Sequence, residues 1–238
     1  MITSDVTFPA STGRPMRAAL AVPATSGRRP AVIVIHELFG LNDDIRRITA
    51  RFSDLGWVAL APDLYDTGGL RALCVARTML ALRRRDGPAF ADLEAARRWL
   101  GTRPEVEATR IGVVGFCMGG GFALLYAVRA PLGAAGVFYG DVPGTVDELR
   151  GVCPVVAGYG GRDRFFAGQG RRLESHLAAL GVPHDLRIYP DAGHSYMSRH
   201  SGLLATLAAW GPMAVGFDAD AEGDSWRRME AFFRTHLG

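Results

Sequence analysis

Two hydrophobic patterns alternate along the chain. Short runs of apolar and β-branched residues predict buried strands at 31–35, 57–61, 110–116, 134–139, 154–159 and 184–189. Between them, apolar residues recur every three or four positions, and this spacing predicts helices at 44–55, 89–100, 119–128, 169–180 and 224–237. Strands that alternate with helices favour an α/β fold, with a mostly parallel central sheet flanked by helices on both faces. No repeat or linker divides the chain, and we expect residues 1–238 to form a single domain.

Composition narrows the chemistry. The 238 residues carry 27 basic and 24 acidic side chains, and every basic residue is arginine. Without lysine, the chain is neither a Schiff-base enzyme nor a P-loop NTPase of the ordinary kind. The net charge of +3 is small and the arginines are spread along the chain, which is not typical of a nucleic-acid binder. We expect a small-molecule substrate, no nucleic-acid or membrane partner, and a monomer or weak homo-oligomer.

The cysteine pattern is not that of a disulfide framework or a CxxC metal site, because Cys74, Cys117 and Cys153 are odd in number and far apart. Cys74 and Cys153 have no chemically suggestive neighbours, and we expect both in the core. The N-terminal residues lack the long apolar segment of a signal peptide. We therefore expect a cytoplasmic protein that uses no metal and no cofactor.

Reactive side chains follow four of the predicted strands. In a parallel sheet, ligands bind beyond the carboxyl ends of the strands. Glu37 follows the strand at 31–35, and Cys117, Asp163 and His194 each follow a later strand. An acid, a thiol, a second acid and an imidazole are therefore expected at one edge of the sheet.

Cys117 lies in the pattern Gly115-x-Cys117-x-Gly119, between a predicted strand and a predicted helix. This pattern is typical of a nucleophile elbow, a strained turn that requires glycine two residues before and two residues after the nucleophile. Such a turn places the sulfur at a helix N-terminus, where the helix dipole favours the thiolate. The alternative is that Cys117 is a small buried core residue, the most common role of cysteine.

A nucleophilic thiol needs a base, and the base needs a residue that orients it. The chain order Cys117, Asp163, His194, with gaps of 46 and 31 residues, is that of nucleophile, acid and histidine in hydrolases with this elbow. Alternatively, His194 is a surface loop histidine. Asp163 is alternatively the cap of a helix that begins near Phe166, and one carboxylate can serve both purposes.

Five segments together resemble the dienelactone hydrolase family, a cysteine branch of the α/β-hydrolase fold. They are 36–40 (HELFG), 61–65 (APDLY), 115–120 (GFCMGG), 160–163 (GGRD) and 192–196 (AGHSY). The resemblance implies an α/β-hydrolase fold and a hydrolase of lactones or carboxylic esters. It also implies specific roles: Cys117 as nucleophile, His194 as base, Asp163 as the residue that orients the base, Glu37 as a control on thiol ionisation, and the backbone N–H groups of Leu38 and Met118 as oxyanion donors.

The chain departs from this family in the region that holds the substrate. Family members that act on dienelactone bind the substrate carboxylate with two arginines. At one of these positions this chain has residues 66–68 (DTG), and near the other it has Arg199, one residue later than expected. Arg199 is therefore a candidate for binding an acidic substrate group. The apolar stretch 202–217 follows the catalytic loop, and the region 200–220 is either core packing or a helical lid over the pocket.

The expected chemistry is attack of Cys117 on an acyl carbonyl, formation of a thioester, and its hydrolysis by water that His194 activates. A carboxylate at Glu37 would disfavour the thiolate by like charge, so that the resting enzyme holds a thiol protected from oxidation. Two other classes stay open. One is a non-catalytic member of the fold that binds small acyl ligands, and the other is a redox protein that uses Cys117.

Overall fold

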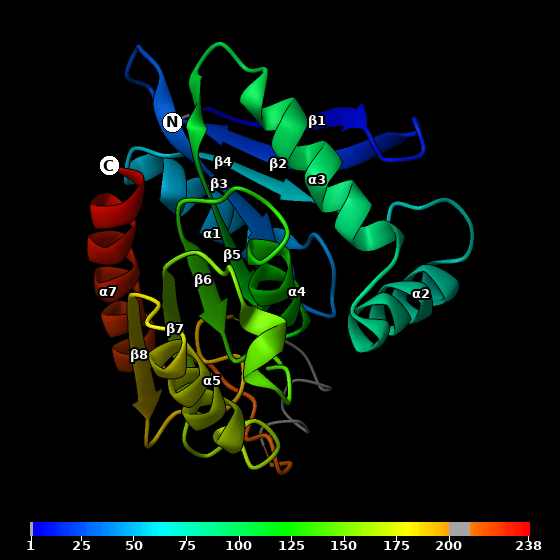
Figure 1. Ribbon diagram of the computed structural model, residues 1–238. Helices are drawn as coiled ribbons and strands as arrows, with labels where there is room; N and C mark the ends of the chain where they lie inside the picture. Colours follow the sequence, from blue (N-terminus) through cyan, green and yellow to red (C-terminus); the bar gives the residue numbers. More distant parts are fainter. Residues whose placement is uncertain (1, 200–209) are drawn as a thin grey trace.

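Eight strands form one sheet in the part of the chain that the computed structural model describes, residues 2–199 and 210–238 (Figure 1). The strands are β1 (Ile2–Pro9), β2 (Pro15–Val22), β3 (Arg29–Ile35), β4 (Val58–Pro62), β5 (Val106–Phe116), β6 (Ala135–Phe138), β7 (Val155–Gly160) and β8 (His184–Tyr189). Their order across the sheet is β1-β2-β4-β3-β5-β6-β7-β8. β1 pairs antiparallel with β2, and β2 with β4, whereas all the pairs from β4 to β8 are parallel.

Helices cover both faces of the sheet (Figure 1). They are α1 (Asp43–Asp54), α2 (Arg71–Arg84), α3 (Pro88–Gly101), α4 (Met118–Ala127), the short 3-10 helix η1 (Val146–Leu149), α5 (Ala167–Ala179) and α7 (Ala219–Leu237). α1 and α7 lie on one face, where Phe52 of α1 contacts Trp226 and Phe233 of α7. α3, α4 and α5 cover the other face, and α2 packs against α3 and α4 from outside. The predicted α/β fold is confirmed.

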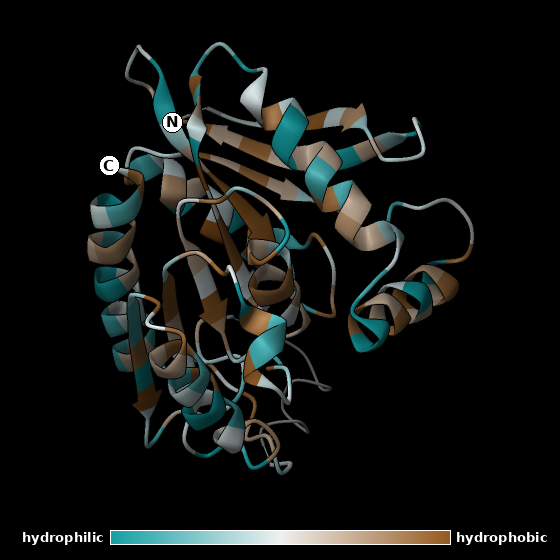
Figure 2. Cartoon of the chain, in the orientation of Figure 1, coloured by the Kyte–Doolittle hydropathy of each residue, from teal (hydrophilic) through white to brown (hydrophobic). Residues whose placement is uncertain are grey.

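The central strands are buried on both faces, which explains why they read as continuous apolar runs in the sequence. Figure 2 shows this apolar interior between helices that are polar on their outer sides. Ile33 of β3, Val113 of β5 and Val137 of β6 are all inaccessible to solvent. Helices on both faces leave the carboxyl ends of the parallel strands as the open edge of this layered structure.

Three elements carry no clear sequence signal and were not predicted. β1 lies at the edge of the sheet with most of its residues exposed, so it has no apolar run. β2 also lies outside the parallel strands, where the alternating pattern of burial is weak. α2 begins without a capping side chain and without an acidic residue in its first turn. Leu73 and Leu80 of α2 are exposed, so its apolar residues do not form a single buried face.

The last helix begins earlier than the sequence pattern predicts. α7 starts at Ala219, five residues before the predicted start, because the Asp218 side chain accepts hydrogen bonds from the N–H groups of Asp220 and Ala221. Of the region 200–220, which the sequence leaves open as core packing or a lid, residues 200–209 lie outside the described residues. The described residues 210–218 form turns and irregular backbone that lead into α7. Within the described residues, no helix has the length and apolar character needed to cross a membrane.

Candidate active site

The carboxyl ends of the parallel strands bring the predicted site residues to one edge of the sheet. The register sets Ile35, the last residue of β3, opposite Gly115, near the end of β5. It also sets Gly160 at the end of β7 opposite Tyr189 at the end of β8. Because these strands end at the same level, the loops that follow them meet above the same part of the sheet. Glu37, Cys117, Asp163 and His194 stand in those loops.

Cys117 occupies a strained turn between β5 and α4. Its backbone has φ 55° and ψ −119°, a conformation that residues other than glycine rarely adopt. A Cβ atom added to Gly115 would lie 1.9 Å from the carbonyl oxygen of Gly119, and one added to Gly119 would lie 2.3 Å from the carbonyl oxygen of Ile35. The Cys117 N–H donates to the carbonyl oxygen of Phe138 at 3.0 Å, which ties the turn to the neighbouring strand. Both glycines are therefore required, as the elbow pattern predicts.

Asp163 divides its carboxylate between two tasks. One oxygen, Oδ2, lies 2.6 Å from Nδ1 of His194, and both side chains are buried. The other oxygen, Oδ1, accepts hydrogen bonds from the N–H groups of Phe165 and Phe166, both at 3.1 Å, in the turn before α5. The two sequence interpretations of Asp163 are therefore compatible. The backbone contacts fix the carboxylate, and the carboxylate fixes the imidazole.

The His194 imidazole lies between the rings of Tyr139 and Phe166, with centroid distances of 5.1 and 4.9 Å. Its Nε2 atom is buried and has no hydrogen-bond partner with regular geometry among the described residues. Burial opposes a charge on His194, but the hydrogen bond to Asp163 and the neighbouring Cys117 outweigh it and raise the pKa of His194 to about 10. With this pKa the imidazole is protonated at neutral pH.

Glu37 belongs to a buried chain of hydroxyl groups. Ser198 Oγ donates to Glu37 Oε1 at 2.9 Å, and Tyr139 Oη lies 3.2 Å from Ser198 Oγ. Since the single Ser198 proton is given to the carboxylate, Tyr139 is the donor to Ser198. Burial raises the pKa of Tyr139 well above its usual range, and the charges of Glu37 and Cys117 add to the effect. Tyr139 therefore keeps its proton and lies close to both the acid and the thiol.

The predicted oxyanion donors are Leu38, in the loop after β3, and Met118, the first residue of α4. Neither backbone N–H donates a hydrogen bond to the protein among the described residues. At a helix N-terminus the first N–H groups have no partner within the helix, so that of Met118 is available to an anion.

One family matches most of the chain. The model of the dienelactone hydrolase family aligns with residues 16–237. The chain belongs to the dienelactone hydrolase family. A relative from Salmonella typhimurium that is named after carboxymethylenebutenolidase is 30% identical, and the alignment covers 100% of this chain and 89% of the relative. A relative from Methylorubrum extorquens with the same name is 29% identical, with coverage of 99% and 82%.

A solved structure, that of a dienelactone hydrolase-like promiscuous phosphotriesterase from metagenomic libraries, agrees with this assignment. It is 25% identical, its TM-score is 0.82, and the superposition covers 100% of this chain and 99% of that chain. The predicted α/β-hydrolase fold and the predicted family are both confirmed. This dienelactone hydrolase family member is therefore a hydrolase of carboxylic esters or lactones.

The structure of this dienelactone hydrolase family member does not bring the Arg199 guanidinium to the thiol. The guanidinium lies over the ring of Phe217, 4.8 Å from its centroid, and the Arg199 N–H donates to Asp44 Oδ2 at 3.1 Å. The residue before it, Ser198, contacts Glu37 instead. The role of Arg199 in binding an acidic substrate group stays a prediction.

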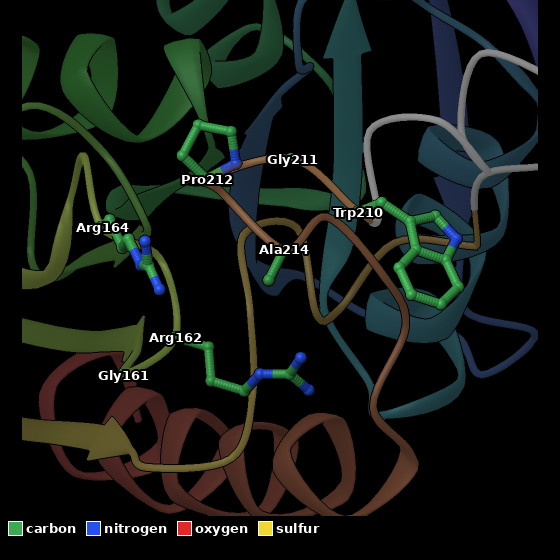
Figure 3. A pocket seen from close by; sticks show the side chains of 7 residues that line it. All are labelled: Gly161, Arg162, Arg164, Trp210, Gly211, Pro212 and Ala214. Carbon is green, nitrogen blue, oxygen red and sulfur yellow. The ribbon is translucent and has the colours of Figure 1, made fainter.

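No sequence pattern in this family member indicated that Ser198 and Tyr139 form a hydrogen-bonded chain with Glu37. Ser198 and Glu37 are 161 residues apart, and only the folded chain brings them together. Figure 3 shows a further feature that the sequence did not indicate, a hollow of about 560 Å³ that is lined by Gly161, Arg162, Arg164, Trp210, Gly211, Pro212 and Ala214. Neither Cys117 nor His194 lines this hollow, although two of its lining residues, Arg162 and Arg164, flank Asp163 in the chain.

Proposed function

We propose that the chain hydrolyses lactones or carboxylic esters through a triad of Cys117, His194 and Asp163 and a thioester acyl-enzyme. The observation that carries this proposal is the buried His194 imidazole, held by Asp163 at 2.6 Å in the loop that meets the Cys117 elbow; the hydrogen bond to Asp163 and the neighbouring Cys117 raise the pKa of the imidazole. A base fixed by a carboxylate and set beside a thiol in a strained elbow is the arrangement that nucleophilic acyl transfer requires.

In the acylation half-reaction, the Cys117 thiolate attacks the carbonyl carbon and forms the C–S bond. The carbonyl oxygen becomes an oxyanion, to which the N–H groups of Leu38 and Met118 donate. When the oxyanion collapses, the bond from carbon to the ester or ring oxygen breaks. The leaving oxygen takes the proton from the His194 imidazolium, and a thioester with a neutral imidazole remains.

In the deacylation half-reaction, neutral His194 removes a proton from water as the water oxygen attacks the thioester carbon. The same two N–H groups hold the second oxyanion. The C–S bond then breaks, which releases the carboxylic acid and restores the thiolate beside the imidazolium. These steps need no metal and no cofactor, because the thiolate supplies the nucleophile and the backbone supplies the electrostatic stabilisation.

Two charges act on the thiol in opposite directions in this proposal. The His194 imidazolium favours the thiolate, whereas the Glu37 carboxylate disfavours it by like charge. Ser198 and Tyr139 hold Glu37 in place, so its effect on Cys117 depends on this buried chain. A substrate that moves Glu37 would release the nucleophile. Glu37 is accordingly proposed as a control on the thiol and not as a member of the triad.

The test is turnover of p-nitrophenyl acetate by the wild type, Cys117→Ala and Cys117→Ser, with Cys153→Ala as the matched control. We expect Cys117→Ala to lose turnover with an unchanged fold, Cys117→Ser to keep weak activity, and Cys153→Ala to equal the wild type. Burial raises the pKa of the Cys153 thiol to about 12, so iodoacetamide should label Cys117 and spare Cys153. Mass spectrometry of the quenched enzyme should find the acyl group on Cys117. Near-wild-type activity in Cys117→Ala would refute the proposal.

The assay also separates the two other classes. A ligand-binding member without catalysis would bind acyl compounds with no turnover, and a redox protein would lose its activity on thiol oxidation without forming a thioester. A screen of lactones and esters with and without an acidic group then identifies the substrate class. A cytoplasmic location and a monomeric or weakly associated state are proposed with this function.

A further inference from the structure

Three consecutive carbonyl groups in the loop after β3 are each held by a side chain. The carbonyl oxygen of Glu37 lies 2.7 Å from Nδ1 of His36 and accepts from the N–H of Gly40 at 3.0 Å. The carbonyl oxygen of Leu38 accepts from the Tyr65 hydroxyl at 3.0 Å, and that of Phe39 accepts from Arg71 Nη2 at 2.9 Å. The loop therefore has a fixed backbone orientation although the Leu38 and Phe39 side chains are exposed.

The His36 contacts fix the direction of the Leu38 N–H. The Leu64 N–H donates to His36 Nε2 at 3.1 Å, so Nε2 is the acceptor and Nδ1 carries the proton that goes to the Glu37 carbonyl. Burial lowers the pKa of His36, which keeps the ring neutral and this tautomer in place. In a planar trans peptide the N–H points opposite to the carbonyl. With the Glu37 carbonyl held, the Leu38 N–H points away from His36.

Tyr65 connects this loop to the start of α4. Its hydroxyl, which donates to the carbonyl oxygen of Leu38, also lies 3.4 Å from Met118 Sδ, so one atom contacts both residues that carry a proposed donor, though not the N–H groups themselves. The Tyr65 ring packs against His36 with a centroid distance of 4.7 Å, and the Arg71 guanidinium lies 5.6 Å from its centroid. Burial raises the pKa of Tyr65, and the nearby charge of Cys117 adds to this, so the hydroxyl remains a donor.

Gly40 makes the close approach of this loop to Tyr65 feasible. Its φ is +79°, and a Cβ atom there would lie 2.7 Å from Arg71 Nη2 and 3.0 Å from Tyr65 Cδ2. A side chain at this position would push the loop off the tyrosine and would be strained in this backbone conformation.

We propose that Tyr65 is a positioning residue for the oxyanion hole. By holding the loop after β3 against the start of α4, Tyr65 sets the separation between the N–H groups of Leu38 and Met118 that the oxyanion requires. The inference rests on the proposed function, since it assigns to Tyr65 the geometry of a site that acts only during acyl transfer. Tyr65 does not touch the reacting atoms. Its effect passes through the carbonyl of Leu38, which lies in the peptide next to the one that carries the Leu38 N–H, and through the side chain of Met118 at the first residue of α4.

The test compares Tyr65→Phe with Tyr159→Phe. Tyr159 is the control, because it is also buried and its hydroxyl donates to the carbonyl oxygen of Gly140 at 3.1 Å and not to a residue that carries a proposed oxyanion donor. Each variant loses one hydroxyl, so we expect similar losses of thermal stability. Removal of an oxyanion donor lowers kcat about 10²- to 10³-fold, and its displacement costs less, so Tyr65→Phe should lower kcat for p-nitrophenyl acetate about ten- to a hundredfold. KM should change less than about threefold, and Tyr159→Phe should keep wild-type kinetics.

Alkylation of Cys117 by iodoacetamide distinguishes a positioning role of Tyr65 from a general structural role. Alkylation needs the thiolate but no oxyanion, so its rate and pH profile should be the same in Tyr65→Phe and the wild type. An unchanged kcat in Tyr65→Phe overturns the inference, and so does an alkylation rate that falls by the same factor as kcat. Cys117→Ala in the same assay keeps the two proposals apart. If Cys117→Ala is active, the proposed function fails, whereas if it is inactive and Tyr65→Phe is fully active, only the role of Tyr65 fails.

Discussion

Gly119→Ala should damage both stability and catalysis, because Gly119 is the point at which α4 meets the end of β3. A Cβ atom at this position would lie 2.3 Å from the carbonyl oxygen of Ile35 and 2.7 Å from that of His36, whereas real Cβ contacts are essentially never under 3.0 Å. Both obstacles are backbone atoms that cannot rotate away. The helix and the strand must therefore separate by at least about 0.7 Å, the difference between 2.3 and 3.0 Å.

The size of the effect follows from two opposing terms. Overpacking of a rigid site costs about 1–3 kcal/mol, and immovable backbone on both sides favours the upper end. Alanine in place of glycine inside a helix returns about 1 kcal/mol. The net loss should be about 2 kcal/mol, which for a chain of this length lowers the midpoint of thermal unfolding by about 4–8 °C. The same displacement moves Cys117 relative to Leu38, so kcat/KM should fall at least about tenfold even where the protein is folded.

Gly121→Ala is the matched control on the same helix. A Cβ atom there would meet the Leu82 side chain at 3.2 Å, which can adjust, and the backbone nitrogen of Asp141 at 3.6 Å, an ordinary contact. This variant should therefore be as stable as the wild type or more stable by up to about 1 kcal/mol. Thermal unfolding followed by circular dichroism and turnover of p-nitrophenyl acetate at 25 °C measure both effects. If Gly119→Ala unfolds at the same temperature as Gly121→Ala and keeps wild-type activity, the tight elbow geometry is wrong.

Three further predictions concern charged groups. The pKa of His194 is about 10 in the folded protein against an ordinary 6.5, so the stability that its protonation contributes is complete below pH 6.5 and is lost as the pH rises to about 10. The difference in thermal midpoint between the wild type and His194→Gln should therefore shrink between pH 6.5 and about 10. A difference that stays constant over this range contradicts the prediction. Glu37→Gln removes a like charge near the thiol and should speed alkylation of Cys117 about tenfold at neutral pH, whereas an equal rate would leave Glu37 a packing residue. Arg199→Ala should lower kcat/KM about ten- to a hundredfold for a carboxylated lactone and leave its methyl ester unaffected, and equal effects on the two substrates would remove Arg199 from the site.

Local sequence patterns determined the central strands and the nucleophile elbow. A strand covered on both faces must be apolar throughout, so β3, β5, β6 and β7 are recognisable without knowledge of their neighbours. The elbow is a local sequence pattern, but only Gly115 is required by the nearby chain, since its Cβ would meet the backbone of Gly119, whereas Gly119 is required by the backbone of Ile35 and His36 at the end of β3. Asp163 and His194 each come directly after a later strand. Because parallel strands present their carboxyl ends at one edge of the sheet, the sequence also indicated that these two residues lie near Cys117.

Only the tertiary structure decided which side chains meet above that edge. Ser198 contacts Glu37 across 161 residues, and the Tyr65 hydroxyl reaches Leu38 and Met118 across 27 and 53 residues. These contacts depend on the order of strands in the sheet and on the paths of loops that have no repeating pattern. The packing of the Arg199 guanidinium on Phe217 is a further contact that the sequence did not indicate. Hydrophobic periodicity specifies which face of an element is buried, whereas the partners of a polar side chain are set by the three-dimensional arrangement of all the elements around it.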